Sequence, residues 1–357
     1  MGIDTFISID RLMTLLVVFA VSIVIVLSRT IHQHITSDLP DKVQGLHVTP
    51  VPRVGGSGIF IGLVVGMLIL NQPFGSTGWL LLVSALPVFI FGTLEDIYME
   101  VTPLKRLVAA VASGGMAIFL LQVWISGIRV PVFDTLMAWA PAGIFFTIFA
   151  SATMCHAYNL SDGLNGLCSG FAIIALTGIG VMALKVGDAE VANLSFVFVF
   201  AILGFWGVNF SSGKIFLGDG GAYLLGHLVA WLSIILSARH PEVSPWALFL
   251  NTLIPLLDTI SAIARRMGHK LPVDMPDRQH FHHLVYDAIG KRFPTLLPPV
   301  FRNSLAALTF LVLAALCSSI AIIYSGFTTT AMGICLVFGA ILFFTSRKLY
   351  KYIYKVS

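Results

Sequence analysis

Four short polar motifs interrupt an otherwise apolar chain, and each contains side chains suited to binding a metal ion or a phosphate group. In the first motif, Glu95 and Asp96 are adjacent at the end of an apolar run, and Lys105 stands at the start of the next run. Carboxylates hold hard divalent cations, and basic side chains facing them hold phosphate oxygens. Taken alone, this motif also fits an interfacial turn whose charged groups reach water.

The second motif runs from Asn159 to Gly166 and places an Asn, an Asp and a further Asn between two apolar stretches. Asn159 and Asp162 are three residues apart, so they share one face of a helical turn and both offer oxygen atoms to a cation or a sugar. Asn165 is a further candidate for substrate binding. The alternative interpretation is a connecting turn rich in Asn and Gly.

The third motif centres on Asp219, which glycines flank immediately before an apolar run. Glycine lets a metal or a diphosphate approach the backbone closely, and the N-terminus of the helix that follows favours anions. The Gly-x-Gly-Asp signature of intramembrane aspartyl proteases would need glycine at position 216, where this chain has Phe216. The motif therefore favours a phosphate or metal site over a protease.

The fourth motif lies in the longest polar loop, where Arg278 is followed by His280, His282 and His283. The spacing lacks the additional Cys or carboxylate ligands of a usual zinc site. Protonatable donors for a diphosphate fit these histidines better.

Two supporting stretches add further candidates for substrate binding. Arg53 follows the first polar loop in the sequence Pro-Arg-Val-Gly-Gly. Asp258 and Arg265 are seven residues apart, about two helical turns, so they share a helix face. The alternative for Arg265 is a basic residue that marks the cytoplasmic end of a helix.

The elements that carry these motifs must lie in a membrane. The chain has 357 residues, of which 57% are hydrophobic and 11% charged, and its mean hydropathy is +0.93, too apolar for a water-soluble core. We predict an all-α, polytopic membrane helix bundle that forms one domain over residues 1–357. Eleven spans are expected, with ten as the alternative, starting near Leu12, Gly58, Trp79, Leu104, Ala142, Cys168, Asn193, Gly221, Trp246, Ser304 and Thr328.

The distribution of lysine and arginine predicts the orientation, because basic loops stay in the cytoplasm. With the N-terminus outside, seventeen of the 21 basic residues fall in inside loops, and only Arg11, Arg129, Lys185 and Arg239 fall outside. The C-terminus is then cytoplasmic. Carboxylates beside a hydrocarbon core are costly and usually functional, and five of them come to the cytoplasmic ends of the spans: Glu95, Asp96, Asp162, Asp219 and Asp258.

Together and in this order, the motifs resemble the polyprenyl-phosphate N-acetylhexosamine-1-phosphate transferase family, which includes the phospho-N-acetylmuramoyl-pentapeptide transferases. The resemblance covers about residues 47–284. It implies catalytic roles for Glu95, Asp96, Asp162 and Asp219, and Mg²⁺, or Mn²⁺ in its place, held by Asp219 and Asn159. The family usually has Asp where Glu95 stands and often a second Asp where Asn165 stands. The spacing of the three histidines resembles the bacterial branch that starts lipid-linked cell-envelope polysaccharides.

The resemblance also implies the substrates and the reaction. A phosphate oxygen of undecaprenyl phosphate would attack the β-phosphorus of a UDP-N-acetylhexosamine and release UMP. The expected sugar donor is UDP-GlcNAc. Such phosphoryl transfer depends mainly on positioning and charge neutralisation. The expected location is the bacterial inner membrane with the site facing the cytoplasm; no nucleic-acid partner is expected, and a homodimer is compatible with the sequence.

Two other classes of protein are alternatives. A transporter with an ion-coupled carboxylate site predicts acids near mid-span and a repeated half-structure, whereas the acids here gather at one face and no internal repeat is evident. A membrane scaffold without catalysis would leave the clustered histidines and acids unexplained. Both are less consistent with the sequence than a transferase.

Overall fold

The computed structural model describes residues 8–31, 37–38, 51–69, 75–98, 100–268, 280–293 and 299–354. Apart from a two-residue antiparallel pair, β1 (Ser37–Asp38) with β2 (Val51–Pro52), the described secondary structure is helical. In hydrocarbon every backbone N–H and C=O must be paired within the protein, and a helix achieves this for any apolar sequence. The predicted all-α bundle is confirmed.

Each of the eleven predicted spans corresponds to a helix. Nine described helices are long and apolar enough to cross a membrane, and they are α1 (Ile9–Leu27), α4 (Gly75–Tyr98), α5 (Pro103–Leu121), α7 (Ala140–Leu160), α8 (Leu167–Val186), α9 (Ala189–Ser212), α10 (Gly218–Arg239), α14 (Pro299–Ile323) and α15 (Thr328–Tyr354). A tenth span is a bent pair, α11 (Pro245–Asn251) with α12 (Leu253–Gly268), whose axes differ by 77°. The run expected from Gly58 forms α3 (Gly55–Ile69), an apolar helix of only 15 residues.

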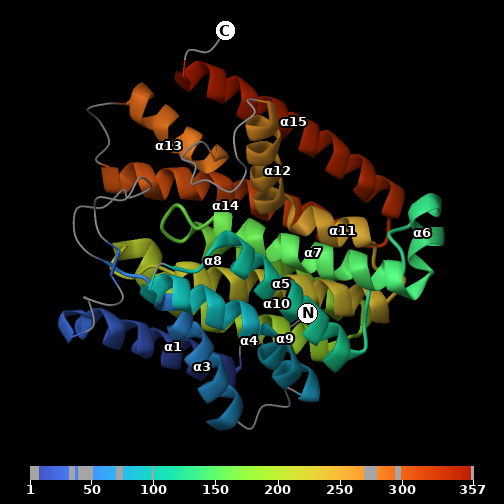
Figure 1. Ribbon diagram of the computed structural model, residues 1–357, viewed down its shortest axis with the longest axis horizontal. Coiled ribbons are helices and arrows are strands. Elements are labelled where there is room, and N and C mark those ends of the chain that lie inside the picture. The colour runs from blue at the N-terminus through green and yellow to red at the C-terminus, as the bar shows by residue number, and fades with distance from the viewer. Residues whose placement is uncertain are drawn as a thin grey trace.

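The long helices run side by side (Figure 1), while α6 (Pro131–Met137) lies at one edge of the bundle and α13 (Phe281–Arg292) lies near α14. Large apolar side chains are exposed along α1, α5, α7, α14 and α15. An exposed apolar surface of this extent needs lipid rather than water around it. The molecule is therefore a multi-pass membrane protein.

Helix α10 forms the centre of the bundle, and 83% of an 18-residue apolar stretch within it is buried. Glycines on its first turn allow neighbouring helices to approach closely. A Cβ atom added to Gly92 of α4 would lie 2.6 Å from the Cα atom of Gly220, and one added to Gly56 of α3 would overlap Gly221. Because no larger residue fits at these crossings, glycine sets the register in which the end of α4 meets the start of α10.

Candidate active site

The contact between α4 and α10 places Asp96 at the N-terminus of α10. One carboxylate oxygen of Asp96 accepts the backbone N–H of Asp219 at 2.8 Å, and the other accepts that of Gly220 at 2.9 Å. The N-cap residue of α10, Leu217, supplies no side-chain cap. Asp96 is only 2% exposed, and it pairs with N–H groups that would otherwise be buried without a partner. Its negative charge is also favourable at the positive, N-terminal end of the helix dipole.

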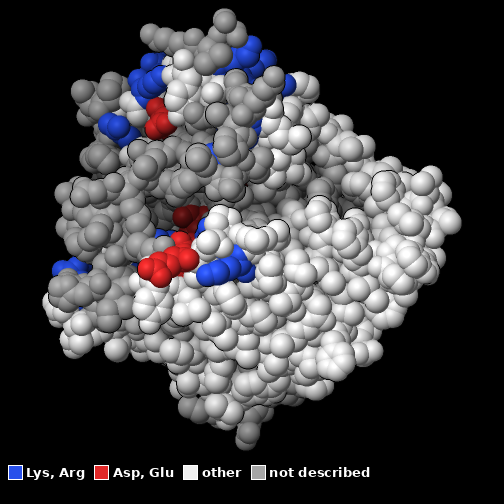
Figure 2. Space-filling model, in the orientation of Figure 1, with Lys and Arg blue, Asp and Glu red and all other residues white. Residues whose placement is uncertain are grey.

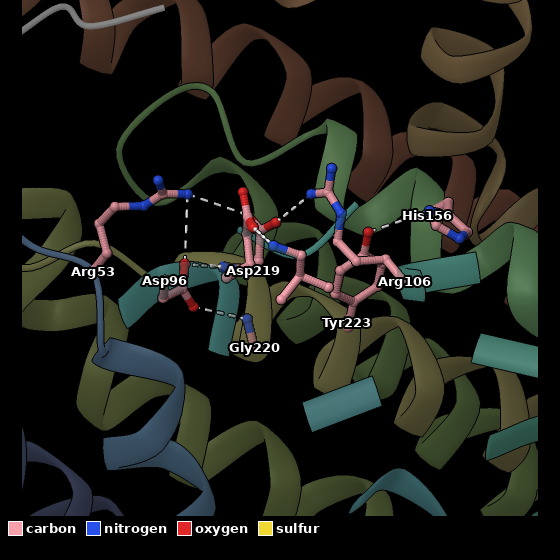
Figure 3. A network of polar contacts seen from close by, with 9 residues as sticks. Arg53, Asp96, Arg106, His156, Asp219, Gly220 and Tyr223 are labelled. Carbon is pink, nitrogen blue, oxygen red and sulfur yellow. Dashed lines mark hydrogen bonds and ion pairs between the residues drawn. The ribbon is translucent and has the colours of Figure 1, made fainter. Parts of the chain in front are cut away.

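Asp219 lies between two arginines from different parts of the chain (Figure 3). Its Oδ1 is 3.2 Å from Nη2 of Arg53, and its Oδ2 is 2.6 Å from Nη1 of Arg106. Arg53 is also 3.5 Å from Asp96. A buried carboxylate is costly unless it is paired in this way, and guanidinium groups are well shaped to hold phosphate oxygens.

Backbone hydrogen bonds fix Arg53 beside α10. The N–H of Phe216 donates to the carbonyl of Pro52 at 2.8 Å, and the N–H of Gly55 donates to the carbonyl of Phe216 at 2.9 Å. Gly218 has a positive φ of 76°, and a Cβ atom there would overlap the Arg53 carbonyl and lie 2.5 Å from Oδ2 of Asp96. Glycine was predicted here to let a metal or a diphosphate approach the backbone. In the structure, Gly218 leaves room for the carboxylate of Asp96 and the carbonyl of Arg53.

Arg106, rather than Lys105, is the basic residue of the first motif that reaches Asp219. Both residues lie in the first turn of α5, which Thr102 caps by accepting the N–H of Lys105 at 3.4 Å. Successive residues of a helix point about 100° apart, so only one of the two faces the bundle; Lys105 is exposed and Arg106 is half-buried. Sequence reasoning named Lys105 as a site residue and missed Arg106, because nothing in the motif specifies how α5 is rotated.

Two further polar side chains lie next to this cluster and were also missed. The hydroxyl group of Tyr223 is 3.3 Å from Nδ1 of His156, and the two rings meet edge to face (Figure 3). Tyr223 follows Asp219 by four residues and His156 precedes Asn159 by three. These are helical spacings onto one face, so the predicted site residues themselves could have indicated both.

The loop between α7 and α8 is held in place from several sides. The N–H of Asn165 donates to the side chain of Asn303 on α14 at 2.9 Å, and the N–H of Gly166 donates to that of Asn209 on α9 at 2.6 Å. Asn159 lies in the last turn of α7, where its carbonyl accepts the N–H of Asp162 at 3.2 Å. The Asn/Gly-rich segment is therefore an ordered part of the bundle.

Asp162 is half-buried in this loop and lies within the electrostatic reach of the Asp219 cluster. Burial raises the pKa of Asp162 from its ordinary 3.8 to about 7, with Arg53 lowering the pKa and Asp219 raising it further. Burial has the largest effect because a carboxylate removed from water loses its hydration, which the hydrogen bond from the backbone of Gly218 replaces only in part.

The raised pKa of Asp162 predicts a pH-dependent stability. The folded protein prefers the protonated acid, so stability should fall as the pH rises from 3.8 towards 7 and change little above that. In detergent without divalent cations, the melting temperature should therefore fall by several degrees more between pH 5 and 7 in the wild type than in Asp162→Asn. All other titratable groups are the same in both proteins, so the difference between the two slopes is diagnostic; equal slopes would contradict the assignment.

A histidine cluster also contacts this loop. Nδ1 of His282 is 2.5 Å from one oxygen of Asp258, and Nδ1 of His280 is 3.6 Å from the other. A Cβ atom added to Gly163 would overlap Nε2 of His282 and lie 2.9 Å from Nε2 of His283. The loop is thus in contact with the histidines and within reach of the Asp219 cluster.

Two further predicted residues, Glu95 and Arg265, make contacts of their own, and the charge of Glu95 also acts on Arg106 and Tyr223 in the Asp219 cluster. Glu95 is half-buried and accepts the N–H of Val101 at 2.8 Å, which closes the turn between α4 and α5. The guanidinium group of Arg265 lies 5.6 Å from the ring centre of Tyr350 on α15. Arg278 lies outside the described residues.

The donors fit a hard cation by their chemistry, since Asp219, Asp162 and Asn159 offer only oxygen. Among the described residues, however, no three His, Cys, Asp or Glu side chains form a ready metal cluster. Both oxygens of Asp219 contact arginines. A cation that bound Asp219 would therefore have to displace one of the arginines from it. The displaced arginine could then bind phosphate oxygens.

Charged side chains gather on parts of the molecular surface. Figure 2 shows acidic and basic side chains at the left centre and at the top of the face in view, beside a wide area without charge. The helical bundle and the charged clusters at its helix ends define a multi-pass membrane protein with a polar site suited to phosphate groups.

Comparison with known proteins identifies the family. The model of glycosyl transferase family 4 matches residues 78–237. A probable undecaprenyl-phosphate N-acetylglucosaminyl 1-phosphate transferase of Bacillus subtilis is 31% identical over 77% of this chain and 78% of its own length. Undecaprenyl-phosphate alpha-N-acetylglucosaminyl 1-phosphate transferases of Escherichia coli and Yersinia pestis are 28% and 30% identical, each over 68% of this chain and 67% of their own length. This chain belongs to the polyprenyl-phosphate N-acetylhexosamine-1-phosphate transferase family.

Proposed function

We propose that this protein transfers GlcNAc-1-phosphate from UDP-GlcNAc to undecaprenyl phosphate and releases UMP. A phosphate oxygen of the lipid forms a bond to the β-phosphorus of the nucleotide sugar, and the bond from that phosphorus to the bridging oxygen breaks, so UMP leaves with the electron pair. The product is a lipid-linked sugar diphosphate that starts cell-envelope polysaccharide synthesis. The family membership and the names of the relatives support the acceptor and the sugar.

One observation carries the mechanism: Asp219 holds Arg53 and Arg106 beside the Asp162 loop, and the histidine cluster packs against that same loop. Guanidinium groups and histidine nitrogens thus lie beside the loop where a diphosphate would lie. Phosphoryl transfer needs charge neutralisation and alignment more than covalent help from the protein. Arg53 and Arg106 would bind phosphate oxygens, and Asp96 would keep the first turn of α10 in place.

Mg²⁺ would be held by Asp219 with Asn159, and when bound it would neutralise charge on the diphosphate. Removing divalent cations with EDTA is therefore expected to stop UMP release, and adding Mg²⁺ or Mn²⁺ should restore it. The melting temperature measured in the same samples serves as the control, since a protein that unfolds in EDTA would lose activity for another reason. Full turnover in EDTA would exclude the cation from the reaction.

The decisive experiment is UMP release by the purified protein in lipid nanodiscs with undecaprenyl phosphate, Mg²⁺ and single UDP-sugars. UDP-GlcNAc should give release that depends on the lipid phosphate, and UDP-GalNAc tests the choice of sugar. If no UDP-sugar gives release, the proposed function is wrong. The transporter alternative lacks support, because the family match is to transferases and the carboxylates Asp96 and Asp219 lie at the ends of helices.

The proposed site faces the cytoplasm, where nucleotide sugars are found, and the lipid phosphate reaches it from the membrane interface. This orientation predicts the labelling of introduced cysteines, since the four native cysteines are buried. Lys214 and Glu242 are exposed in the connections at opposite ends of α10. In intact spheroplasts an impermeant maleimide should label Glu242→Cys at once but Lys214→Cys only after permeabilisation; the reverse pattern would invert the topology.

A further inference from the structure

We propose that Asp258 is a positioning residue that aims Nε2 of His282 at the Asp162–Gly163 loop, where a phosphate group of the substrate would lie. The inference rests on the proposed function and assigns Asp258 a role other than direct contact with the substrate. It follows from how both oxygens of the carboxylate are used.

Asp258 is 5% exposed, and its oxygens contact three groups of the histidine segment. Oδ1 accepts the backbone N–H of Phe281 at 2.7 Å and lies 3.6 Å from Nδ1 of His280, while Oδ2 lies 2.5 Å from Nδ1 of His282. His280 is the N-cap residue of α13, but its side chain caps nothing. The carboxylate from α12 therefore pairs with a backbone N–H at the start of α13 and with one ring nitrogen of His282.

The other nitrogen of His282 is left available. The side chain of His282 is 1% exposed, and Nε2 is buried with no hydrogen-bond partner among the described residues. A buried polar atom without a partner is costly, so it usually has a function. Nε2 points at Gly163, where the absence of a side chain leaves room for it.

A histidine whose Nδ1 is held by a carboxylate has a fixed ring plane, and the hydrogen bond decides which nitrogen is presented to a ligand. Without that bond the ring of His282 could turn about its χ angles, and Nε2 would spend less time facing the loop. The groups that face the ring are Asp258 from α12, His280 just before α13, His283 from α13, and the loop that carries Asp162. Among the residues that the structure describes, Asp258 is the group hydrogen-bonded to Nδ1 of His282.

A double-mutant cycle separates positioning from simple structural support. Asp258→Asn should lower kcat/KM for UMP release by about 10–100-fold, the range seen when a group that orients a histidine is removed. In a His282→Ala background the same change should alter kcat/KM by less than about 3-fold, because two residues that act through one contact are not additive. Asp258→Glu, which keeps the charge on a longer side chain, should show the same dependence on His282 and replaces Asp258→Asn if that variant does not fold.

The matched control is Asp134→Asn, since Asp134 also accepts a backbone N–H, from Ile128 at 2.7 Å, but lies on α6. It should lower the melting temperature without changing kcat/KM. If Asp258→Asn costs as much with His282 as without it, or lowers only the melting temperature, Asp258 is merely structural and the inference is wrong. Absence of UMP release by the wild type would instead overturn the proposed function.

Discussion

Asp219→Asn is expected to lower kcat for UMP release by about 1,000-fold, at the upper end of losses for one electrostatic group in an active site. Asp219 is the carboxylate that both Arg53 and Arg106 contact. Asparagine keeps the shape of the side chain but removes the negative charge that pairs with both guanidinium groups, and it offers a cation one oxygen instead of two. The effect should fall mainly on kcat, because the arginines remain present to bind phosphate.

Glu242→Gln is the control for Asp219→Asn. The Glu242 side chain is 58% exposed and lies between α10 and α11, beyond the far end of α10 from Asp219. The change removes one carboxylate from the protein and should leave kcat unaltered. If Asp219→Asn kept turnover within about 3-fold of the wild type while Asp219 contacts both arginines, charge at this position would contribute less than about 1 kcal/mol to the barrier, and the site assignment would fail.

Arg106→Ala should lower kcat/KM by about 100-fold, whereas Lys105→Ala should change it by less than about 3-fold, because the first removes a half-buried charged contact and the second an exposed side chain. The two residues are neighbours on α5, but only Arg106 contacts Asp219, at 2.6 Å. Arg106→Lys should recover only part of the activity, because a single ammonium group does not reproduce the planar fork of donors.

The comparison of Arg106→Ala with Lys105→Ala is internally controlled, since each variant removes one positive charge from the first turn of the same helix. A net electrostatic attraction of the nucleotide would respond about equally to both. A larger loss in Lys105→Ala than in Arg106→Ala would show that α5 is rotated differently about its axis.

The order of the helices could be predicted from the sequence because it depends on properties of single segments. An apolar run long enough to cross a bilayer becomes a helix whatever surrounds it, so each of the eleven expected starts falls in a helix. The exceptions concern length and straightness. The run from Gly58 is a short helix, and the one from Trp246 is bent at Thr252, since neither property is set by hydropathy alone.

The sequence also determined which residue types could do chemistry, because carboxylates and histidines at the ends of apolar runs are few and costly. Only the tertiary structure decided their partners. The glycine contact between α4 and α10 turns Asp96 into a cap for α10, the rotation of α5 selects Arg106 over Lys105, and the bend before α12 brings Asp258 to His282. Helical spacing fixes which residues share a face of one helix, but the register and rotation between helices arise from side chains far apart in the chain.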